Sequence, residues 1–123
     1  MPLTWFENQA SFIRTNLPIY FKNVRREGIA YLLLTFVKLN IKNNEDVNYI
    51  KEAIYQFLVL DIPHYSTSQL LNLAWCMCVE QRYGPEWQAS ILPMLNKILA
   101  SKKNTKDLFM ISQIVLCLKF DQP

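Results

Sequence analysis

The sequence predicts an all-α fold, a short α-solenoid of about three antiparallel helical hairpins. A thirteen-residue apolar pattern occurs three times, at residues 27–39, 69–81 and 108–120. The copies begin 42 and then 39 residues apart, and periods near 40 are typical of stacked helical hairpins. Each copy also follows another amphipathic stretch of helical length. We therefore expect residues 1–123 to form a single helical-repeat domain with six helices.

The first hairpin is expected at residues 4–44. Its first helix should end near Leu17, because Pro18 lacks a backbone N–H and disfavours helical geometry in the residue before it. The second helix, over residues 24–41, carries the first copy of the pattern. A polar run at residues 42–46 should end it.

The second hairpin is expected at residues 45–83. Asn44 or Asp46 can cap its first helix, because both side chains accept hydrogen bonds from free backbone N–H groups. Ser66 and Gln69 have the spacing of a capping box. A new helix, which carries the second copy, should therefore begin just after Ser66.

The third hairpin is expected at residues 84–121. Gly84 can take the left-handed conformation that ends the preceding helix. Pro93 falls inside the fifth helix and should kink it or divide it. Asn104 or Thr105 can cap the sixth helix, which carries the third copy. A globular six-helix bundle is the alternative all-α fold, and the repeat spacing favours the solenoid.

The composition indicates a folded chain that hides part of its surface in a larger assembly. The sequence is 51% hydrophobic and 19% charged, which suits a substantial core. A mean hydropathy of +0.04 is high for a soluble monomer of this size, so another subunit or further repeats should cover some apolar surface. The net charge of +3 permits contact with phosphate but does not require it.

The residues needed for common catalytic and metal sites are missing from their usual patterns. Gly28 and Gly84 are the only glycines and lie far apart, which excludes the glycine-rich loops that hold phosphate. His64, the single histidine, occupies a turn without a metal-ligand spacing nearby. We therefore expect no enzyme activity, no cofactor, no metal and no small-molecule substrate. No apolar run approaches the roughly 18 residues of a membrane span.

Three cysteines, Cys76, Cys78 and Cys117, lie inside the repeated apolar helices. Their odd number favours a reducing compartment over a disulfide framework. Cys76 and Cys78 point roughly 200° apart on a helix with about 3.6 residues per turn, so they cannot bind one metal ion together. We expect them to be buried as small apolar side chains.

Basic residues cluster at two of the turns that lie inside hairpins, and in a stack these turns share one edge. Seven of the thirteen basic residues should gather there and contact RNA: Lys22, Arg25, Arg26, Lys97, Lys102, Lys103 and Lys106. The alternative is ordinary helix-end chemistry, because cations are often found at helix ends.

The aromatic residues divide between the expected core and the expected surface. Four have core spacing, namely Tyr31, Phe36, Phe57 and Trp75. Trp87 and Phe120 are the candidate anchors for a protein partner. Asn72 lies among apolar neighbours, where its amide could meet the edge of a base or pair with a turn.

Residues 66–99, STSQLLNLAWCMCVEQRYGPEWQASILPMLNKIL, carry a resemblance to a known family. They resemble the helical repeats of organellar RNA-binding proteins, chiefly the FAST-kinase-domain family and the heptatricopeptide and octotricopeptide repeat proteins. The matching residues are Ser68, Leu70, Leu71, Asn72, Leu73, Ala74, Trp75 and Val79. The other two copies of the pattern lack the tryptophan, and residues 1–123 do not include a RAP-like nuclease-related domain.

The resemblance implies a non-catalytic scaffold of an organellar ribonucleoprotein, in the mitochondrial matrix. Such a scaffold would contact RNA, including ribosomal RNA, through the basic edge and protein neighbours through apolar faces. The alternative is a protein-only adaptor, or a structural subunit of a larger complex without RNA contact, in another reducing intracellular compartment. Charge reversal at Lys102, Lys103 and Lys106 would weaken RNA binding only in the first case.

Overall fold

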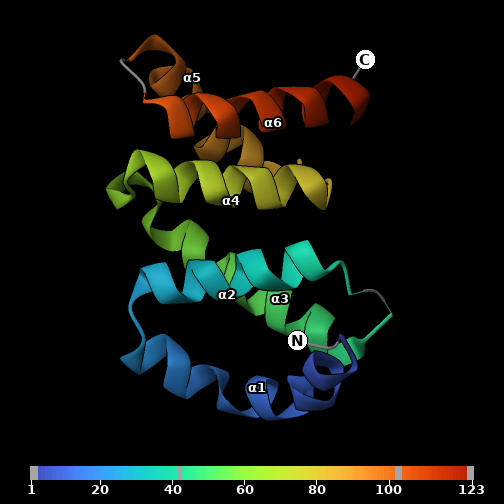
Figure 1. Cartoon of the computed structure of the whole chain (residues 1–123). Coiled ribbons are helices and arrows are strands. Elements are labelled where there is room, and N and C mark those ends of the chain that lie inside the picture. Colours follow the sequence, from blue (N-terminus) through green and yellow to red (C-terminus); the bar gives the residue numbers. More distant parts are fainter. Residues whose placement is uncertain (1–2, 42, 102–103, 122–123) are drawn as a thin grey trace. The chain divides into compact units, whose positions relative to one another are not determined.

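The computed structural model describes residues 3–41, 43–101 and 104–121. It is 86% helical with six α-helices, and no strand occurs in these ranges, which confirms the all-α prediction (Figure 1). The chain divides into two compact units, Met1–Leu60 and Asp61–Pro123, and the division falls inside the second expected hairpin. The stacking of hairpins into a solenoid stays a prediction.

The N-terminal unit contains α1 (Leu3–Asn23), α2 (Arg26–Leu39) and α3 (Glu45–Leu58). In this unit α3 packs against both α1 and α2. Arg14 of α1 donates to the carboxylate of Asp46 at 3.0 Å, and further along, the rings of Phe21 and Phe57 stack with centroids 4.5 Å apart. The earlier residue of α1 contacts the earlier residue of α3, and the later residue contacts the later one. The two helices therefore run in the same direction.

The predicted end of the first helix near Leu17 is wrong, because α1 continues through Pro18 to Asn23. An internal proline costs a helix about 3 kcal/mol. Contacts with α3 lie on both sides of Pro18, through Arg14 before it and Phe21 after it. These tertiary contacts hold α1 together as one helix and outweigh the local cost.

The C-terminal unit is built on α4 (Thr67–Val79), which follows a 3₁₀ segment, η1 (Val59–His64). A π-helical turn, η2 (Trp87–Ile91), leads into α5 (Leu92–Ala100), and α6 (Thr105–Asp121) ends the unit. Both η2 and α5 pack against α4, and α6 lies along α4 in the same direction (Figure 1). The second and third copies of the sequence pattern are therefore parallel neighbours, as expected of a helical repeat.

Buried residues occupy most of the circumference of α4, and the remaining side carries Ser68, Asn72, Trp75 and Val79. The buried side chains of the helix are Leu70, Leu71, Leu73, Ala74, Cys76, Met77 and Cys78. The prediction that Cys76 and Cys78 serve as buried apolar side chains is confirmed, and Cys117 on α6 is half-buried. None of these three cysteines forms a disulfide.

Three of the predicted helix starts are confirmed by their capping bonds. The Ser66 hydroxyl accepts from the Gln69 backbone N–H at 3.2 Å, and the Gln69 side chain accepts from the Ser66 N–H at 2.9 Å. The side chains of Asn44 and Asn104 accept backbone bonds of 3.1 and 2.8 Å in the first turns of α3 and α6. Local hydrogen bonding thus determines where these helices begin.

The end of α4 differs from the prediction, because Gln81 and not Gly84 takes the left-handed conformation (φ 56°). The Arg82 N–H donates to the Met77 carbonyl at 2.7 Å, which is the long bond of a Schellman ending. The Tyr83 hydroxyl also donates back to the last turn of α4 at 3.3 Å. These bonds turn the chain before it reaches Gly84.

Pro93 divides the fifth helix, as predicted. It has no N–H with which to bond the carbonyl four residues earlier, and its ring would crowd that carbonyl in a regular helix. The chain widens by one residue in η2, where the Leu92 N–H donates to the Trp87 carbonyl five residues back. A π-turn of this kind is a known way to absorb such a conflict.

We expect Ser66→Ala to lower the free energy of unfolding by about 1 kcal/mol, because the free N–H in the first turn of α4 loses its partner. Urea denaturation followed by circular dichroism measures the change. Thr67→Ala, at the exposed next position, is the control and should change stability by less than about 0.5 kcal/mol. Equal losses in the two variants would contradict the capping role.

Candidate functional site

An apolar groove separates α5 from α6 in the C-terminal unit. Both helices pack on α4, but they are not closely packed on one another, and the space between them measures about 230 Å³. Its lining is Leu92, Leu95, Asn96 and Leu99 from α5 with Ile111, Ile114, Val115 and Leu118 from α6. Asn96 is the only polar side chain in this lining.

Exposed apolar side chains also occur elsewhere on α6 and at the end of α5. Leu99, Leu108, Phe109, Val115 and Leu116, which together with the groove we call the α5–α6 face, are each half or more exposed. Phe109 is the most exposed of them at 66%. A helix that is apolar on most sides is normally buried, so this face is the surface of the unit best suited to a partner.

Trp87, the predicted partner anchor, is buried, with only 2% of its surface exposed. Its ring meets the edge of Tyr83 at a centroid distance of 5.3 Å, and η2 packs against α4. The prediction is therefore wrong, because the π-turn directs this indole into the core. The side chain of Phe120, the other predicted anchor, lies outside the described residues.

The four aromatic residues with core spacing have different environments. Phe36 is buried as predicted, and Phe57 and Trp75 are half-buried. The prediction is wrong for Tyr31, which is 71% exposed on α2. Its position fits the apolar periodicity of the helix but falls on the side that faces solvent.

In the N-terminal unit the predicted RNA-contacting residues surround the short turn between α1 and α2. Lys22 and Arg25 are exposed there, and Arg26 is half-buried. Arg25 occupies the N-cap position of α2 and makes no capping bond with its side chain. The turn thus presents cations next to the positive end of a helix dipole.

In the C-terminal unit Lys97 is exposed in the last turn of α5, and Lys106 is exposed in the first turn of α6. Lys102 and Lys103 lie outside the described residues. The expected common edge joins residues of both units, and it stays a prediction.

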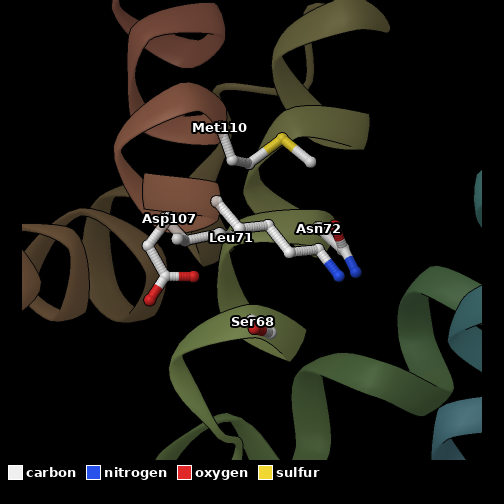
Figure 2. A pocket seen from close by; sticks show the side chains of 6 residues that line it. Ser68, Leu71, Asn72, Asp107 and Met110 are labelled. Carbon is white, nitrogen blue, oxygen red and sulfur yellow. The ribbon is translucent and has the colours of Figure 1, made fainter. Parts of the chain in front are cut away.

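A small polar notch lies where the start of α6 meets α4 (Figure 2). Its lining is Ser68, Leu71, Asn72, Lys106, Asp107 and Met110. The accessible space is about 20 Å³, room for roughly one water molecule and too little to enclose a base. Asp107 is 8% exposed here, in the first turn of α6, where the helix dipole favours a carboxylate. Asn72 is half-buried in this notch, so the structure does not place it in a base-sized site.

Among the described residues, no group of three or more His, Cys, Asp and Glu side chains is arranged to hold a metal ion. The side chain of His64 lies outside those residues. No helix that the structure describes is long and apolar enough to cross a membrane.

We expect Trp87→Ala to lower the free energy of unfolding by about 3–5 kcal/mol, because it leaves a large cavity beneath η2. Tyr31→Ala removes an exposed ring and should cost less than about 0.5 kcal/mol. Urea denaturation distinguishes the two variants. A small loss for Trp87→Ala would restore this residue as a candidate surface anchor.

Comparison of the chain with protein-family models, with curated proteins and with solved structures found no match. The resemblance of residues 66–99 to organellar RNA-binding repeats stays a prediction.

Proposed function

We propose that this protein is a non-catalytic helical-repeat scaffold that holds a protein neighbour through the α5–α6 face. The observation that carries the proposal is the set of exposed apolar side chains around an apolar groove. Fully burying one Leu or Phe side chain contributes roughly 1.5–3 kcal/mol. Because several such side chains share this face, covering it would supply a stable interface.

The shape of the face supports the same proposal. The exposed side chains of Phe109 and Leu116 lie on one side of α6, where they can enter a pocket on a partner. The groove residues of α6 lie roughly 150° around the helix from them, so exposed apolar surface surrounds much of α6.

RNA contact at the turn between α1 and α2 is the second candidate function. The helix dipole favours cations at the end of a helix and disfavours them at its start. Arg25 and Arg26 stand at the start of α2, so helix-end stabilisation does not account for them, whereas it accounts for Lys22 in the last turn of α1. A phosphate would pair with the exposed Arg25 and approach the positive end of the α2 dipole.

The resemblance of residues 66–99 to organellar RNA-binding repeats suggests where in the cell these two surfaces act. It favours a subunit of a mitochondrial ribonucleoprotein, in which one surface meets protein and the other meets RNA. A protein-only adaptor would use the α5–α6 face alone.

Glutamate at Phe109 and Leu116 together tests the protein-docking function. We expect the double variant to leave the endogenous complex, seen by native mass spectrometry, with the thermal unfolding midpoint unchanged, because charges are placed on an apolar interface. Tyr31→Glu is the matched control on an exposed aromatic residue and should stay in the complex. If the double variant remains bound as well, the α5–α6 face is not the docking surface.

The RNA function is tested by Arg25→Glu compared with Lys38→Glu, an exposed cation elsewhere on α2. Arg25→Glu should weaken binding to single-stranded RNA and reduce the slope of log K against log salt by about 0.7 for each lost phosphate contact. Filter binding at several salt concentrations measures both. Equal effects from the two variants would argue against a site at this turn and would favour the protein-only adaptor.

A further inference from the structure

An exposed apolar strip runs along α1, on the side away from the core of the N-terminal unit. Ala10 and Leu17 of this helix are buried, and two residues after each comes a large exposed side chain, Phe12 or Ile19. Two residues correspond to about 200° of rotation, so the buried and exposed sets lie on nearly opposite sides of the helix. Trp5, seven residues before Phe12, continues the exposed strip. The helix is thus apolar on two sides, and the unit buries one of them.

The three exposed side chains lie nearly in line. Trp5 is 47% exposed, Phe12 61% and Ile19 56%. Their spacing of seven residues differs from two full helical turns by only about 20°, and the strip from Trp5 to Ile19 is about 21 Å long. One exposed apolar side chain needs no explanation, whereas three in a heptad spacing have the form of a seam between two helices.

The strip carries no charge of either sign. Between Trp5 and Ile19 the sequence holds two charged residues, Glu7 and Arg14. Arg14 donates to the carboxylate of Asp46 on α3, and Glu7 follows Trp5 by two positions, which places it on the other side of the helix. Two copies of this side of α1 would therefore meet without repulsion between like charges.

Polar side chains separate the three apolar ones, and they are amides and a hydroxyl. They are Asn8, Gln9, Thr15 and Asn16, and together with Trp5, Phe12 and Ile19 they form what we call the α1 outer face. The Thr15 hydroxyl donates to the Ser11 carbonyl at 2.9 Å, and the Asn16 amide donates to the Phe12 carbonyl at 2.8 Å. Because their own helix supplies part of their hydrogen bonding, these two side chains cost less to cover than polar groups that depend on water alone.

The pattern of the α1 outer face is symmetric about Phe12. Apolar side chains lie seven residues before and after it, and polar side chains lie three and four residues before and after it. Two antiparallel copies that meet at Phe12 would pair apolar with apolar and polar with polar, namely Trp5 with Ile19, Asn8 with Asn16 and Gln9 with Thr15. A two-fold interface must be complementary to itself in this way, whereas an unrelated partner sets no such requirement.

Two properties favour the antiparallel direction over the parallel one. An antiparallel pair sets Trp5 against the smaller Ile19, whereas a parallel pair would set two tryptophans against each other. Antiparallel helices also place the positive end of each dipole beside the negative end of the other.

We propose that the α1 outer face joins two copies of this chain through an antiparallel, two-fold contact between their α1 helices. This inference goes beyond the proposed docking function, because it concerns another surface in the other unit. The dimer carries two α5–α6 faces and two cationic turns, so it can hold two neighbours or grip one assembly at two points.

Sedimentation velocity of the full-length chain over a dilution series tests the dimer. We expect a dimer that dissociates on dilution, and Phe12→Glu should raise its dissociation constant at least about tenfold, because two carboxylates then meet at the axis. The thermal unfolding midpoint should not change, because Phe12 is exposed. Tyr31→Glu, on an exposed aromatic residue of α2, is the matched control and should still dimerise.

Three results of this experiment would overturn the inference. They are a chain that stays monomeric at every concentration, a dimer that survives Phe12→Glu, and a dimer that is dissociated by glutamate at Phe109 and Leu116. The last result would mean that two copies meet through the α5–α6 face. Because that double variant also tests the docking function, release of the neighbour with an intact dimer keeps the two surfaces distinct.

A charge pair tests the direction of the contact. Asn8→Glu combined with Asn16→Lys places glutamate opposite lysine twice in an antiparallel dimer, and like charges opposite each other in a parallel one. The dimer should tighten about fivefold at low salt, and the gain should shrink at high salt. Asn8→Glu with Asn48→Lys, an exposed position on α3, adds the same charges without the pairing and is the control. Equal or weaker association of the paired variant would overturn the antiparallel contact.

Discussion

The need to bury α4 organises the C-terminal unit. The buried side chains of α4 occupy all but one side of the helix, so several neighbours pack against it at once. The neighbours include α6, which packs along α4, and α5 with η2, which pack on another part of it. Because α5 and α6 both pack on α4 and are not closely packed on each other, an apolar groove lies between them. The helix at the core of the unit thus also supports both walls of the groove.

Local sequence signals predicted the helix starts well, and tertiary contacts decided where predictions failed. The bonds of Ser66, Asn44 and Asn104 join residues three positions apart, so a single sequence reveals them. The passage of α1 through Pro18 depends on contacts with α3, which no local pattern shows. The turn after α4 was missed for a different reason, because local bonds from Arg82 and Tyr83 accompany a left-handed Gln81, whereas glycine is the usual residue at such a position.

The sequence predicted that apolar surface would need a cover but not where that surface lies. The mean hydropathy signalled an excess of apolar side chains. On α6 these side chains occupy most sides of the helix, so the helical period alone does not select the buried side. Packing on α4 selects it, burying Ile114 and leaving Leu108 and Leu116 exposed. Trp87 is the opposite case, a side chain expected at the surface and found in the core. Its position near a helix start suggested exposure, but the π-turn η2 buries it.

The π-turn before Pro93 also sets the rotational phase of α5. A π-turn holds one residue more than the α-helical turn it replaces, and one residue corresponds to about 100° of rotation about the helix axis. In the observed phase Leu95 and Ile98 are buried, while Leu92 and Leu99 line the groove. Deletion of a single residue between Glu86 and Leu92 would rotate α5 by that angle and remove one wall of the groove. The shape of the docking surface is thus encoded in the length of a segment that forms no part of it, which makes the spacing of this segment as consequential as its chemistry.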